Sequence, residues 1–201
     1  MDSTFEQVQG LSGIADDTFI FGRSEADHDR HILNTLNTAR VNNVKLKPDK
    51  FQFKVEESSF FGFTWTAEGL KPDKKKVKST VEMQPRQDLS ELQPFMGMIN
   101  YLNQFSPAIA QVSEPLRQLM KKEVAFVWLP EHDRALKELK QLITNAPVLA
   151  YYDIEKDNII QSDASQKGLG CVLLQDGKPI CYASGSLSDA ERDTVTFSEN
   201  C

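Results

Sequence analysis

The sequence predicts an α+β fold, with strands near both ends of the chain and helices between them. Residues 11–21 and 51–66 are rich in the aromatic and β-branched side chains typical of strands. Residues 73–144 instead repeat apolar side chains every three to four positions, which indicates amphipathic helices. Residues 158–183 return to short apolar runs separated by Gly and Asp. Taken together, these stretches predict an α+β fold.

The first strand-rich stretch contains two adjacent carboxylates, Asp16 and Asp17, between short apolar runs. The pattern predicts two strands joined by a turn at or beside the acidic pair. Such a turn brings two carboxylates to one point, and carboxylate oxygens are the ligands that Mg²⁺ prefers. The alternative is an ordinary turn, because Asp is common there for local hydrogen-bonding reasons.

Composition and charge narrow the classes of function. The chain has 201 residues, 40% of them hydrophobic, so it can bury a core and is not predicted to be disordered. The net charge of −6 argues against a generally basic nucleic-acid binder. Residues 44–86 nevertheless carry a net charge of +4, between residues 1–43 at −4 and residues 147–201 at −5.

The basic segment contains a cluster of five lysines: Lys71, Lys74, Lys75, Lys76 and Lys78. A basic strip flanked by acidic sites suits a metal-dependent enzyme that acts on phosphate backbones. The alternative is a solvated lysine face on a helix.

Cysteine usage and the absence of export signals favour an intracellular protein, cytoplasmic or nuclear. The three cysteines are an odd number, and Cys171 and Cys181 lie in apolar runs, which predicts buried or free thiols rather than disulfides. The first residues do not resemble a signal peptide, and no apolar run reaches the length needed to span a bilayer.

The first half of the chain also predicts one helix and two strands. Ser24 is a good N-cap, with Asp27 three residues later, for a helix that extends to about residue 43. Its expected apolar stripe comprises Ile32, Leu33, Leu36, Ala39 and Val41. Alternating apolar residues predict a half-buried strand over 51–55, and four aromatic side chains predict a second strand over 59–66.

The middle of the chain predicts helices over 73–81, 88–105 and 131–144, with a further helical stretch from Pro107 that is interrupted by Pro115. Pro94 lies early in the second of these helices, where a kink or a later helix start is expected. Residues 126–128 are predicted to be extended.

The last third predicts a meander of three strands over 158–163, 169–174 and 179–183, followed by a helix from Ser188. An Asp-Gly pair at residues 176–177 is a hairpin signal between the second and third strands. The first strand ends at Asp163, which is either a candidate metal ligand or the cap of the following turn.

Several short motifs occur together in one order, and the set resembles the polyprotein of gypsy-type LTR retrotransposons. They are IADD at residues 14–17, FG at 61–62, EGLKPD at 68–73, FMGMINY at 95–101, APVLAY at 146–151, QSDAS at 161–165 and GLG at 168–170. The resemblance extends over nearly the whole chain, from the end of a reverse-transcriptase palm, through the thumb, into a ribonuclease H-like domain.

The resemblance implies a division of the chain into residues 1–70 (palm), 71–121 (helical thumb), 122–150 (tether) and 151–201 (start of the ribonuclease H-like domain). It implies that Asp16 and Asp17 are the polymerase carboxylates and Asp163 the first ribonuclease H carboxylate, all three of them Mg²⁺ ligands. Residues 60–66 would lie near the primer terminus. The implied nucleic-acid-binding residues are Phe61, Gly62, Lys71, Lys74, Lys75, Lys76 and Lys78, and the implied partners are primer–template duplex and RNA–DNA hybrid.

This sequence departs from the family pattern in three ways. Ile14 replaces an aromatic residue at a position that packs and does not bind metal. The family's second ribonuclease H carboxylate falls on Asn200, and Glu199 fits only with a shift of one residue. The family's third polymerase carboxylate and last two ribonuclease H carboxylates would lie outside residues 1–201.

We therefore expect a fragment of an enzyme that is inactive alone, because two-metal chemistry needs the full set of carboxylates. The alternatives are a non-catalytic nucleic-acid-binding module and a retroelement relic without a selected role.

Overall fold

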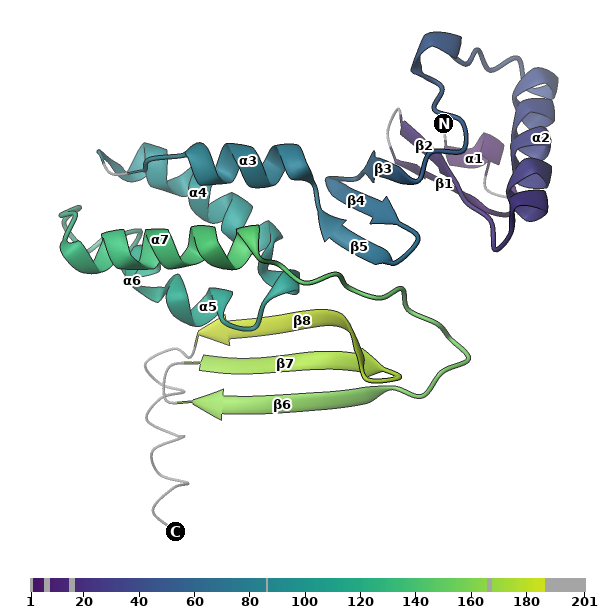
Figure 1. Ribbon diagram of the computed structural model, residues 1–201. Helices are drawn as coiled ribbons and strands as arrows, with labels where there is room; N and C mark the ends of the chain where they lie inside the picture. The colour runs from purple at the N-terminus through teal and green to yellow at the C-terminus, as the bar shows by residue number, and fades with distance from the viewer. Residues whose placement is uncertain (1, 6–7, 15–16, 86, 166–167, 187–201) are drawn as a thin grey trace. The chain divides into compact units, whose positions relative to one another are not determined.

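The computed structural model describes residues 2–5, 8–14, 17–85, 87–165 and 168–186. The chain divides into two compact units, residues 1–61 and 62–201. Figure 1 identifies the helices and strands of both. Helices and antiparallel strands occur together, as the α+β prediction requires. Among the described residues, no helix is both long enough and apolar enough to cross a membrane.

The first unit contains a hairpin and one long helix. Its elements are α1 (Asp2–Phe5), β1 (Leu11–Ile14), β2 (Asp17–Ile20), α2 (Glu25–Val41), the 3₁₀ turn η1 (Pro48–Lys50) and β3 (Glu57–Phe60). Strands β1 and β2 pair antiparallel, with Ile14 opposite Asp17, so the predicted acidic hairpin is confirmed. Ser24 caps α2 by accepting a hydrogen bond from the Asp27 backbone N–H, as predicted.

The buried face of α2 differs from the predicted stripe. Ile32 and Ala39 are buried as expected, but Leu33, Leu36 and Val41 are exposed. Two polar residues, His31 and Thr35, complete the buried face instead. Both polar groups are satisfied, since the His31 ring contacts a backbone carbonyl and the Thr35 hydroxyl donates to the His31 carbonyl.

The strand predicted over residues 51–55 is wrong. Phe51, Phe53 and Val55 are about half exposed and belong to no strand. Lys54 has a positive φ of 49°, which interrupts the extended backbone. Its ammonium group forms ion pairs with Glu25 and Asp29 of α2.

The single aromatic strand predicted over residues 59–66 is also wrong, because a turn divides it. β3 ends at Phe60 and β4 (Phe63–Thr66) begins three residues later. Phe61 and Gly62 have φ values of 52° and 77°, and two consecutive positive φ values reverse the chain there.

The second unit contains a hairpin, a group of helices and a three-stranded sheet. β4 pairs with β5 (Gly69–Pro72), and the helices are α3 (Lys74–Glu82), α4 (Leu89–Tyr101), α5 (Ile109–Val112), α6 (Glu114–Gln118) and α7 (Pro130–Thr144), with the 3₁₀ turn η2 (Asn103–Phe105) after α4. The core residues include Leu92, Phe95, Ile99, Leu116 and Leu139, each fully buried. The predicted helical stripes are thus confirmed.

Local chemistry accounts for the helix ends. Asp73 caps α3 by accepting from the backbone N–H groups of Lys75 and Lys76, and Asp88 caps α4 in the same way. The α4 helix begins directly after its cap, so the expected later start at Pro94 is wrong. Pro94 lies inside the helix on its exposed side. Residues 126–128 form an irregular segment without an assigned strand.

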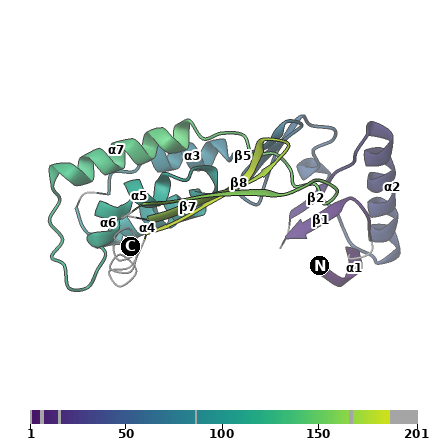
Figure 2. The same ribbon diagram turned by 90° about the horizontal axis from the view of Figure 1, so that it is seen from below.

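The last three strands form the predicted meander. β6 (Ile159–Ser165), β7 (Gly168–Gln175) and β8 (Lys178–Ser186) pair antiparallel in chain order. Asp176 and Gly177 form the predicted turn, with φ values of 51° and 72°. Strand β8 contacts η2 and α5, and Figures 1 and 2 show β8 and α5 in this part of the second unit. Asn103 and Ser184 exchange two hydrogen bonds across this contact.

An isolated bridge joins the β4–β5 hairpin to the segment that precedes the sheet. Leu70 and Leu149 exchange two backbone hydrogen bonds, of 2.7 and 2.9 Å. A Cβ at Gly69 would lie 2.1 Å from the Leu149 carbonyl oxygen, so this approach requires a glycine. The Tyr151 hydroxyl donates to the carbonyl oxygens of Thr66 and Gly69 in the same hairpin.

We predict that Gly69→Ala destabilises the second unit far more than Gly177→Ala. Gly177 also has a positive φ, 72° compared with 143° at Gly69, but open space around its missing side chain, so its substitution should cost roughly 1–2 kcal/mol in backbone strain. Gly69→Ala adds the collision with Leu149 and the loss of two hydrogen bonds, for a total of about 3–4 kcal/mol. Denaturant unfolding of both variants measures the difference, and equal losses would contradict the role given to the bridge.

Candidate functional site

The acidic hairpin presents its described carboxylate at the start of a strand. Asp17 is exposed and is the first residue of β2. The residue before it, Asp16, lies outside the described residues. The geometry therefore places one predicted metal ligand at the end of a hairpin, where its oxygens are accessible.

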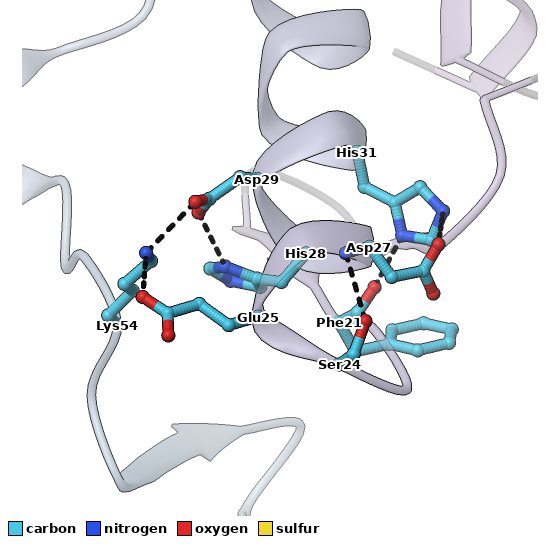
Figure 3. A network of polar contacts seen from close by, with 8 residues as sticks. All are labelled: Phe21, Ser24, Glu25, Asp27, His28, Asp29, His31 and Lys54. Carbon is cyan, nitrogen blue, oxygen red and sulfur yellow. Dashed lines mark hydrogen bonds and ion pairs between the residues drawn. The ribbon is translucent and has the colours of Figure 1, made fainter.

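The other end of this hairpin is held by a polar network that centres on His31 (Figure 3). The Phe21 N–H donates to the Gly10 carbonyl at 2.8 Å and closes the hairpin. The His31 Nδ1 lies 2.7 Å from the Phe21 carbonyl oxygen, and because a carbonyl only accepts, Nδ1 carries a proton. Its Nε2 lies 3.5 Å from the carboxylate of Asp27. A Cβ at Gly10 would lie 1.8 Å from the His31 ring, so glycine makes room for it.

Asp27 links this network to the start of α2. Its carboxylate accepts a hydrogen bond from the Arg23 backbone N–H, which lowers the pKa of Asp27, and the nearby Arg30 and His31 act in the same direction. The ammonium group of Lys54 forms hydrogen bonds with Glu25 and Asp29, and these hydrogen bonds raise the pKa of Lys54. Sequence reasoning missed His31 and Lys54, since single contacts to a carbonyl or a carboxylate leave no periodic signal.

The predicted lysines of the basic segment lie on β5 and α3 but differ in exposure. Lys74, Lys75 and Lys78 are exposed, and Lys78 lies 3.9 Å from Glu82 on the same helix. Lys71 and Lys76 are half-buried. The exposed three lie one and three positions apart and give the first half of α3 a basic surface.

The Lys76 ammonium group lies over the ring of Tyr101, 4.1 Å from the ring centroid. Tyr101 in turn stacks on Phe63, with centroids 4.9 Å apart and planes 11° from parallel. Gly62 is adjacent to this group, since a Cβ there would lie 2.3 Å from the Lys76 Nζ. The ring of Phe61, the residue before Gly62, is 59% exposed.

Burial raises the pKa of Tyr101 to about 12, and the nearby negative charge of Asp73 acts in the same direction. The folded protein thus favours the neutral phenol. Because the folded-state pKa exceeds the usual value of 10.0, the protein should keep this contribution to stability below pH 10 and lose it between pH 10 and 12.

We predict that an absorbance titration of tyrosinate will contain a component with its midpoint at about pH 12. That component should disappear in Tyr101→Phe, which keeps the ring but has no ionisable hydroxyl. The same variant should also lose less stability than the native chain between pH 10 and 12. A component near pH 12 that persists in the Tyr101→Phe variant would show that Tyr101 does not titrate as described.

Asp163 lies on β6 opposite Gly170, and its side chain is exposed. Asp163 therefore lies within strand β6 and not in the turn that follows the strand. Glu199 and Asn200 lie outside the described residues. Within the described residues, no three or more His, Cys, Asp or Glu side chains gather as a metal site would require. Cys171 and Cys181 are half-buried free thiols, as predicted.

Comparison with known proteins identifies relatives. Residues 128–201 match the model of the RNase H-like domain found in reverse transcriptase. The Tf2-3 and Tf2-7 transposon polyproteins of Schizosaccharomyces pombe are each 30% identical to this chain over 181 residues, 88% of its length. The chain is thus similar to part of these retrotransposon polyproteins. The resemblance inferred from its motifs is confirmed, although the chain spans only 14% of each of these polyproteins.

The fold also resembles solved structures of a retroviral enzyme. The foamy viral protease-reverse transcriptase in complex with double-stranded DNA matches with a TM-score of 0.87 at 22% identity, over 95% of this chain and 34% of that one. Its complex with an RNA/DNA hybrid matches with a TM-score of 0.85 at 22% identity, over 99% and 29%. This chain therefore shares the mixed helix and sheet fold of these reverse-transcriptase structures.

Proposed function

We propose that this chain is the part of a retrotransposon reverse transcriptase that holds the primer–template duplex and begins the ribonuclease H domain. The single observation that carries the proposal is the exposed lysine surface of α3 (Lys74, Lys75 and Lys78) on a reverse-transcriptase-like fold. The similar foamy viral enzyme was solved in complex with both double-stranded DNA and an RNA/DNA hybrid. The same two kinds of duplex are the proposed partners here.

The chemistry of α3 suits a phosphate backbone. Three exposed ammonium groups within five residues can each replace a counterion on a nucleic-acid strand, and this attraction carries no sequence information. We further propose that Phe61 and Gly62 contact the nucleic acid near the primer terminus. Support comes from the exposed Phe61 ring, because an aromatic face can stack on a base or a sugar.

The acidic residues would supply the chemistry. We propose Asp16, Asp17 and Asp163 as Mg²⁺ ligands, the first two in polymerisation and the third in hybrid cleavage. The exposed carboxylates of Asp17 and Asp163 have the oxygen donors that Mg²⁺ prefers, so these residues fit the ion as partial ligand sets. Bound ions would stabilise the attacking and leaving oxygens of a phosphoryl transfer.

The proposed division of the chain remains palm over 1–70, thumb over 71–121, tether over 122–150 and ribonuclease H-like domain over 151–201. The helical core of α4 to α7 and the separate β6–β8 sheet support a change of architecture between the thumb and the last part. The RNase H-like family model matches residues 128–201, so the match begins within the proposed tether, before residue 151.

We predict that the chain binds primer–template duplex with little sequence preference and strong salt dependence. Replacement of Lys74, Lys75 and Lys78 by Gln should flatten the slope of log K against log salt by up to about 2–3, at roughly 0.9 per lost phosphate contact. Fluorescence anisotropy with a labelled duplex at several salt concentrations measures the slope.

A charge-matched control separates a local interface from a general effect of net charge. Lys45, Lys47 and Lys50 are also exposed, so their replacement by Gln removes the same charge from the other unit. This control should leave the slope unchanged. Equal slopes for the native chain and the α3 variant would assign the α3 lysines to a solvated helix face.

The role of Asp163 requires the longer polyprotein in which the remaining ribonuclease H residues are present. There we expect Asp163→Asn to abolish Mg²⁺-dependent cleavage of an RNA–DNA hybrid while the melting temperature stays nearly unchanged, because an exposed metal ligand adds little to packing. Cleavage assays and thermal unfolding of the same preparation provide both values. Retained cleavage with a large loss of stability would make Asp163 a structural residue.

A further inference from the structure

Among the α3 lysines, Lys76 has a different environment. Its ammonium group lies 4.1 Å from the centroid of the Tyr101 ring, a distance at which a cation is attracted to the face of an aromatic ring. Its side chain is half-buried, whereas those of Lys74, Lys75 and Lys78 are exposed. An ammonium group held against a ring in this way is poorly placed to meet a phosphate of the backbone.

The side chains of Lys76 and Tyr101 both lie against the backbone of Gly62. A Cβ at this position would lie 2.3 Å from the Lys76 Nζ and 2.4 Å from the Tyr101 hydroxyl oxygen, so both side chains press against the space that the glycine leaves. The φ of +77° is itself a conformation that favours glycine. The Asp73 N–H donates to the Gly62 carbonyl at 3.3 Å, which fixes the same residue from the start of α3.

Tyr101 is a rigid support for this arrangement. Its ring stacks on Phe63, and Phe63 also contacts Phe105 with centroids 5.9 Å apart. Phe63 and Phe105 belong to the buried core of the second unit. The position of Gly62 is therefore set by α3 and by the core, through one cation–π contact and one aromatic stack.

We propose that Lys76 and Tyr101 are positioning residues, which hold the Gly62 turn in place for the nucleic acid, and that Lys76 does not itself bind phosphate. This inference rests on the proposed function for the binding role of the turn. It changes the role that the sequence assigns to Lys76, from one of several equivalent phosphate contacts to the residue that orders the turn.

The first test separates affinity from salt dependence in the full chain. Lys76→Gln should weaken duplex binding about two- to fivefold, the value of one cation–π contact, with an unchanged slope of log K against log salt. Lys75→Gln, the control on the same helix, should flatten that slope by about 0.9. Lys76→Arg should restore the affinity, because a guanidinium group also binds an aromatic face. A slope that flattens in Lys76→Gln as in Lys75→Gln would overturn the proposal.

The second test needs no nucleic acid, so it separates this inference from the proposed function. A double-mutant cycle combines Lys76→Gln with Tyr101→Leu, which removes the aromatic face, and follows denaturant unfolding. We expect a coupling of about two- to fivefold in the unfolding equilibrium constant. The Tyr101→Phe cycle should instead show almost no coupling, because the ring face remains and Lys76→Gln then costs the same with Tyr or Phe at position 101. Coupling without any duplex binding would refute only the proposed function, whereas strictly additive effects would refute the contact on which this inference depends.

Discussion

The two hydrogen bonds between Leu70 and Leu149 connect the parts of the second unit for which separate roles are proposed. On one side they hold the β4–β5 hairpin, which leads directly into the basic helix α3. On the other side they hold the segment that leads into β6, the strand that carries Asp163. Each side is reinforced nearby, by the Tyr151 hydroxyl on the hairpin and by the Ala150 N–H, which donates to the Pro179 carbonyl at 2.7 Å. Backbone groups form the bridge, and its close approach leaves no room for a side chain at Gly69.

The bridge also explains why two of the motifs that identify the family belong together. The motif at residues 68–73 contains Gly69 and Leu70, and the motif at residues 146–151 contains Leu149 and Tyr151. They are distant in the sequence, yet each supplies the hydrogen-bonding partner of the other. The β6–β8 sheet is then fixed at a second point, where Ser184 and Asn103 exchange hydrogen bonds. The Leu70–Leu149 bridge and the Ser184–Asn103 hydrogen bonds together hold the sheet against the helices, although the segment that leads into the sheet is short.

Features of the fold that rest on local chemistry could be predicted from the sequence. Caps at Ser24, Asp73 and Asp88 mark helix starts because a side-chain oxygen satisfies N–H groups a few residues away. The Asp-Gly pair at 176–177 marks a turn because of its backbone preference. What could not be predicted depends on partners distant in the chain. The ion pairs of Lys54 with α2 occur where a strand was expected, and His31, which contacts the Phe21 carbonyl, is buried on α2 where an apolar stripe was expected.

The candidate site shows the same limit. Spacing alone identifies a basic helix, but it treats Lys74, Lys75, Lys76 and Lys78 as equivalent, since the residue that distinguishes Lys76 is Tyr101 on another helix.

The charge distribution limits how this chain could bind nucleic acid. The acidic hairpin and the β6 strand expose carboxylates, which repel phosphates unless cations bind between them. Attraction at long range must then come from the basic segment, and its exposed lysines on α3 provide it at any metal concentration. A general attraction of this kind holds a duplex but does not fix its position. A fixed position requires a rigid point of contact. In the proposed arrangement Lys76 contacts the Tyr101 ring and not a phosphate, so one ionic contact is lost and the Gly62 turn is held more rigidly.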